Sequence, residues 1–179
     1  MKRGGVAAAV LAPVLLIGGV VAAANVGRDD PPPPPAPSPS PTVMASPTNA
    51  AVEKYVADVK PIIEEGGKVV ELGIKPALAD YASGKETLGE LAIESRAWII
   101  ALSGVKRKLA AVPAPPELTA AHATYLRSLD QYLDVAKTLQ RASRDRGAKR
   151  SEVVRRVTRL GDAADDTYDE AVRLVSEHR

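Results

Sequence analysis

Four stretches in which apolar or small residues recur alternately three and four positions apart constrain this chain most strongly. They cover residues 52–77, 88–112, 118–143 and 154–175. Spacings of three and four place side chains on one face of an α-helix, which then packs against neighbouring helices. No stretch shows the alternation typical of a strand. The sequence therefore predicts an all-α fold, and we call the recurring apolar or small positions of each stretch its apolar seam.

Turn and capping residues separate the four seams. Ser46 and Pro47 are typical of a helix start, and Thr87 followed by Glu90 matches a capping box. Four residues with three prolines, 113–116, end the second helix, and Gly147 is a plausible break before the fourth. Short connections between amphipathic helices predict an antiparallel up-down four-helix bundle over residues 47–178.

The first helical stretch is longer than the other three. It must therefore extend past the bundle, bend at Pro61, or divide near Gly66 and Gly67. Gly66 and Gly73 lie seven positions apart on the first seam, where missing side chains would let a neighbouring helix approach closely. We therefore expect both glycines to face another helix and not solvent.

Residues 1–27 have the pattern of an export signal. Lys2 and Arg3 precede 22 residues without charge, residues 6–27. This length spans a bilayer if the segment stays attached, whereas Ala22-Ala23-Ala24 offers a cleavage site. The sequence thus predicts an apolar N-terminal helix that is either a signal peptide or a membrane anchor. In both cases the rest of the chain is extracytoplasmic, anchored by residues 6–27 or secreted after cleavage near Ala24.

Residues 28–46 are rich in proline, including the run 31–35. Proline excludes helix and sheet here and favours extended polyproline II, so we expect a disordered stalk that holds the bundle away from the membrane. The same composition also suits ligands of SH3-type domains. Because the sequence predicts export, we favour the spacer over a ligand of intracellular SH3-type domains.

Charge and composition exclude several functions. The chain carries a net charge of +2, but Lys2 and Arg3 supply it: residues 28–179 hold 24 − 2 = 22 Lys and Arg against 22 Asp and Glu. A neutral domain with few aromatic residues is a poor candidate for binding nucleic acid. The absence of cysteine excludes disulfides and thiolate metal sites.

The strongest charge feature lies between the third and fourth seams. Residues 141–159 contain two acids and eight basic residues, a local charge of 8 − 2 = +6. The eight are Arg141, Arg144, Arg146, Lys149, Arg150, Arg155, Arg156 and Arg159. In an up-down bundle this connection lies at the end away from the stalk. We expect it to contact anionic envelope polymers or an acidic protein, and the alternative is a solvated helix end without a partner.

Other candidate sites favour structural interpretations. Gly66-Gly67-Lys68 lacks the spacing of a phosphate-binding loop. His122 lies on the third seam without a Glu-x-x-His pattern, which favours a hydrogen-bonded, half-buried histidine over a metal ligand. The acidic stretch 161–171 suits a solvated helix face better than a weak calcium or magnesium site; its acids are Asp162, Asp165, Asp166, Asp169 and Glu170.

The seams contain no Arg, Lys, Asp or Glu, so no charged group is expected in the core. We therefore predict no catalytic residue, metal or cofactor. The chain is interpreted as a non-catalytic binding or structural module of the cell envelope. The alternative is a helical domain with a site between its helices that binds a small ligand or a metal, or that catalyses a reaction.

The segment LAAVPAPPELTAAHATYLRSLDQYL, together with GDAADDTYDEA, resembles small exported helical proteins of unknown function from high-GC Gram-positive bacteria. The resemblance covers roughly residues 48–178. It implies a helical bundle and an extracytoplasmic location, and it brings no catalytic residues.

Overall fold

The computed structural model describes residues 47–145 and 147–178. This part of the chain is helical apart from short connections and contains no strand. The expected N-terminal helix, 1–27, and the expected stalk, 28–46, lie outside it.

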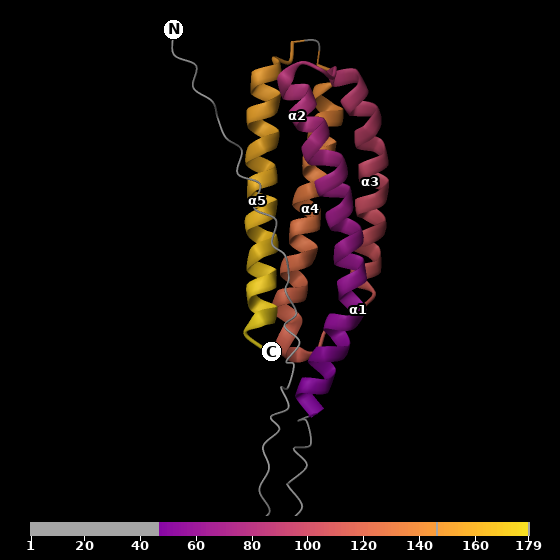
Figure 1. Cartoon of the computed structure of the whole chain (residues 1–179), viewed down its shortest axis with the longest axis vertical. Helices are drawn as coiled ribbons and strands as arrows, with labels where there is room; N and C mark the ends of the chain where they lie inside the picture. Colours follow the sequence, from indigo (N-terminus) through magenta and orange to yellow (C-terminus); the bar gives the residue numbers. More distant parts are fainter. Residues whose placement is uncertain (1–46, 146, 179) are drawn as a thin grey trace, which may run out of the picture. The chain divides into compact units, whose positions relative to one another are not determined.

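Five α-helices and two shorter helical segments follow one another along the described chain. They are α1 (Pro47–Val69), the π-helical segment η1 (Val70–Ile74), α2 (Lys75–Ser83), α3 (Leu88–Ala110), the 3-10 turn η2 (Pro116–Leu118), α4 (Thr119–Ala142) and α5 (Arg150–Ser176). Since α1, η1 and α2 are continuous, they form one long segment, and four helical segments pack side by side in alternating directions (Figure 1). The expected helical bundle is present.

The first segment departs from a regular α-helix at η1. α1 continues through Pro61 and through Gly66 and Gly67 without a break. Directly after α1 the hydrogen-bond pattern widens at Val70, and the N–H of Lys75 bonds to the carbonyl of Val70. Such π-helical turns are rare overall, and those that occur are frequently at functional sites. The first turns of α1 also extend past the other helices at one end of the bundle (Figure 1).

α4 is the most deeply buried helix because it packs against both α3 and α5. Eleven of its residues are buried, and they cover a broader face than the third seam predicts. Leu133 and Val135 belong to this wider face although neither is on the seam. Ser143, the last seam position, is instead exposed and lies beyond the end of α4.

Local interactions end α2 and begin α3. Gly84 takes a left-handed conformation with φ of 85°, which glycine adopts without strain, and its N–H bonds to carbonyls of the last turn of α2. The capping box at the start of α3 is confirmed. The Thr87 N–H donates to Glu90 Oε2 at 2.8 Å, and the Glu90 N–H donates to Thr87 Oγ1 at 3.3 Å.

No helix among residues 47–178 carries an apolar stretch long enough to cross a bilayer. The apolar segment 6–27 lies outside this range.

Candidate functional site

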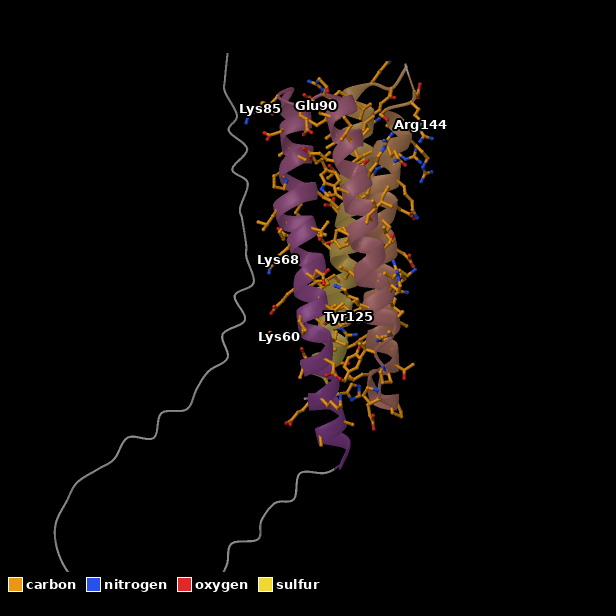
Figure 2. The ribbon with its side chains drawn as sticks, turned by 90° about the vertical axis from the view of Figure 1, so that its right-hand side faces the viewer. Lys60, Lys68, Lys85, Glu90, Tyr125 and Arg144 are labelled. Carbon is orange, nitrogen blue, oxygen red and sulfur yellow. The ribbon has the colours of Figure 1, made fainter. Side chains whose placement is uncertain are left out.

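The basic connection predicted from sequence joins α4 to α5 at one end of the bundle. Seven of the eight basic residues are described, and all seven are exposed; Arg146 lies outside the described residues. Figure 2 shows Arg144 at this end. This end is opposite the start of α1, as the up-down arrangement requires (Figure 1).

These seven cations form no salt bridge within the described part of the chain. The contrast with other surface lysines is clear, since Lys106 lies 2.5 Å from Asp130 and Lys108 lies 2.6 Å from Glu65. Arg141 instead donates to the carbonyl of Lys137 at 3.2 Å. The charges of the basic connection are therefore available to a partner.

Four of the basic residues line a groove between α4 and α5. Two cavities, of about 250 and 430 Å³, adjoin one another, because Thr138, Arg141 and Arg156 line both. Lys149 lines the first cavity, and Arg159 lines the second. We call this the α4–α5 groove. Its acidic lining residues are Asp134, Asp145 and Glu152, so its net charge is 4 − 3 = +1.

The structure does not bring all eight predicted residues together. The guanidinium of Arg150 lies over the ring of Tyr81, 5.1 Å from its centroid, which directs it toward α2. Arg144 and Arg155 do not line the α4–α5 groove. The basic end is thus divided between the groove and the surrounding surface.

The same end of the bundle is acidic on its α2–α3 side. A cavity of about 490 Å³ is lined by Asp80, Glu86, Glu90 and Glu94, with Lys85 the single cation. Burial raises the pKa of Glu86, and the neighbouring carboxylates raise it further. Lys85 and Glu90 lie on one side of this end and Arg144 on the other (Figure 2). Sequence reasoning missed this acidic side, although four acids within fifteen residues around the 84–87 connection could have indicated it.

The acidic stretch of α5 is divided among different partners. Tyr132 donates a hydrogen bond to Asp165, whose other oxygen lies 3.3 Å from Lys75 Nζ. Glu170 pairs with Arg173 at 2.7 Å. Burial lowers the pKa of Lys75, but its contacts with Glu71 and Asp165 outweigh burial and leave this pKa raised. Among the described residues, no group of three His, Asp or Glu side chains is placed to hold a metal.

His122 is half-buried, as expected, and hydrogen-bonded to a tyrosine of α1. Its Nδ1 lies 3.0 Å from the hydroxyl of Tyr55. Burial lowers the pKa of His122. Gly67 and Lys68 lie exposed within the continuous helix α1, so no loop exists there to surround a phosphate.

Comparison with protein-family models, with curated proteins and with solved structures gives no match.

Proposed function

We propose that the chain is an exported, non-catalytic binding module that holds an anionic envelope polymer in its α4–α5 groove. In this proposal residues 6–27 direct export, as a signal peptide or an anchor, and the proline-rich residues 28–46 act as a stalk. The basic end then lies on the far side of the bundle from the membrane.

The observation that carries the proposal is the set of unpaired cations on both walls of one groove. Arg141 contributes from α4, and Arg156 and Arg159 contribute from α5. None of the three forms a salt bridge in the described part of the chain. Cations placed along a groove neutralise successive charges of a linear polyanion and displace its counterions.

The acidic α2–α3 side favours a linear polymer over a broad acidic protein surface. A flat acidic partner covering this end of the bundle would meet Asp80, Glu86 and Glu94 as well as the arginines. Like charges in such an interface cost free energy. A chain lying in the α4–α5 groove avoids those carboxylates.

The test is binding of the purified full chain to polyglycerol phosphate, a linear phosphodiester polymer, at low and at physiological salt. The variant Arg141→Gln/Arg156→Gln/Arg159→Gln removes three groove cations. The control variant, Lys68→Gln/Arg96→Gln/Arg107→Gln, removes three exposed cations elsewhere on the bundle.

We expect the groove variant to bind the polymer at least about tenfold more weakly than the parent and to lose the salt dependence of binding. The control variant should keep the parent's affinity and its salt dependence. Equal weakening in the two variants would show a nonspecific charge effect and contradict the proposal. Binding of an acidic protein such as a glutamate-rich peptide, without binding of the phosphodiester, would contradict it as well.

A further inference from the structure

A second groove lies between α2 and α5 and is separate from the α4–α5 groove. Its volume is about 280 Å³, and Tyr132 and Val135 of α4 line its inner side. α5 packs mainly on α4 and only sparingly on α2, which leaves this space open. The apolar lining residues from the two walls are Ile74, Leu78, Ala79, Ala82, Val154 and Val157.

Small residues leave the space between the walls of this α2–α5 groove unfilled. Ala79 and Ala82 face it from α2, and Gly161 faces it from α5. A Cβ added at Gly161 would meet nothing within 4 Å. The groove is therefore accessible, mainly apolar, and close to the lower limit of volume for ordinary ligand pockets.

Polar groups close one end of the groove. The ion pair between Lys75 and Asp165, 3.3 Å long, bridges α2 and α5, and Tyr132 donates to Asp165. Lys75 also lies 2.6 Å from Glu71. Two carboxylates thus compensate the one cation in the lining, which leaves no free positive charge at this end.

Asp162 lines the same end one turn away from Asp165. It is exposed and forms no salt bridge among the described residues. The charged lining residues Lys75, Asp162 and Asp165 sum to 1 − 2 = −1. This end therefore attracts a positive charge.

The opposite end has the reverse polarity. There the lining is Ala82 and Val154, and Arg150 lies just outside, over the ring of Tyr81. A cationic ligand is thus repelled at the Ala82 end and attracted at the Asp162 end. A ligand with an apolar tail along the walls and a cationic head at Asp162 matches the polarity of both ends.

We propose that the α2–α5 groove binds a cationic amphiphile, a molecule with a short apolar tail and a protonated amine head. The tail covers the apolar walls, and the head contacts Asp162 at the rim. The site does not depend on the polymer proposed for the α4–α5 groove, because the two grooves share no lining residue.

Isothermal titration of the full chain with octylammonium and with octanoate tests the charge preference with tails of matched length. Gly161→Leu adds a large side chain at a residue that lines the groove and where a Cβ meets nothing within 4 Å. Gly104→Leu is the matched control, since a Cβ there also meets nothing within 4 Å, and Gly104 lies on α3 away from the groove. Asp162→Asn removes the rim charge at an exposed position.

The parent and Gly104→Leu chains should bind octylammonium with equal Kd. We expect Gly161→Leu to weaken this binding at least about tenfold, and Asp162→Asn to weaken it about fivefold. Octanoate should bind the parent at least about fivefold more weakly than octylammonium. If Gly161→Leu does not fold, as judged by circular dichroism, the Asp162→Asn and octanoate results still decide.

Three results would overturn the proposal: no octylammonium binding by the parent, octanoate binding as tight as octylammonium binding, or unchanged affinity in folded Gly161→Leu. Preferred binding of octanoate would instead place an anionic head near Arg150.

Discussion

Gly73 lies directly against the indole of Trp98. A Cβ at Gly73 would come within 2.9 Å of Trp98 Nε1 and 3.4 Å of Cδ1. Trp98 is buried and is the only tryptophan in the chain. The missing side chain in η1 therefore sets how closely the first helical segment approaches α3. Gly66 is similar, since its Cβ would lie 3.2 Å from Val105 Cγ1.

Gly73→Ala should destabilise the bundle, whereas Gly67→Ala should stabilise it. At Gly73 the new methyl must displace the rigid indole, which we expect to cost about 1 to 3 kcal/mol. At Gly67 nothing lies within 4 Å, so the gain in helix propensity should add about 1 kcal/mol. Urea unfolding followed by Trp98 fluorescence measures both. Equal changes in the two variants would show that contact with Trp98 does not matter.

The close approach of these glycines could be predicted from the sequence, but the π-helical turn could not. Gly66 and Gly73 lie on the first seam, and both indeed face other helices. A seam with steps of three and four is compatible with a regular α-helix and with one that contains a π-helical turn. The difference depends on how Trp98 and the rest of α3 pack against the segment, which is tertiary information. The breadth of the buried face of α4 also depends on tertiary structure, because α4 packs against both α3 and α5.

The candidate site shows the same division. The sequence located the eight cations, because charge density is a local property. It could not divide them between the α4–α5 groove and the contact of Arg150 with Tyr81, since that depends on side-chain direction around a helix axis. The α2–α5 groove was missed because it forms between segments about eighty residues apart in the chain.

Thr87→Ala tests the capping box that starts α3. The change removes the hydroxyl that accepts from the Glu90 N–H, so one N–H at the start of α3 loses its partner. Loss of such a cap costs about 1 kcal/mol of unfolding free energy. Thr87→Ser keeps the hydroxyl and should unfold at nearly the parent urea concentration. A Thr87→Ala midpoint equal to the parent's would mean that water replaces the cap without cost.

The lowered pKa of His122 predicts that the folded protein loses stability on mild acidification. Burial lowers the pKa of His122 in the folded protein, so the unfolded chain binds a proton at higher pH than the folded chain does. The stabilising contribution is complete above the ordinary histidine pKa of about 6.5 and is lost as pH falls toward the lowered value. Unfolding free energies between about pH 7 and about pH 5 should fall less in His122→Gln than in the parent. The control His178→Gln, at an exposed position after α5, should lose as much stability as the parent between these pH values. A fall as large as the parent's in His122→Gln would show that His122 does not cause the loss.

Buried tyrosines predict a second loss of stability at alkaline pH. Burial raises the pKa of Tyr55 to about 12, and it is also the main cause of raised pKa values at Tyr125, Tyr132 and Tyr168. Above the ordinary pKa of about 10 the unfolded chain loses these protons first, so the folded state binds more protons and stability falls as pH rises.

For Tyr55 alone this effect amounts to about 1 kcal/mol at about pH 11. Urea unfolding at about pH 9 and about pH 11 measures the fall, and tyrosinate absorbance of the native protein shows whether the hydroxyls stay protonated. Tyr55→Phe should show a smaller fall between the two pH values than the parent. Native tyrosines that ionise near pH 10, as in the unfolded chain, would show that burial does not protect them.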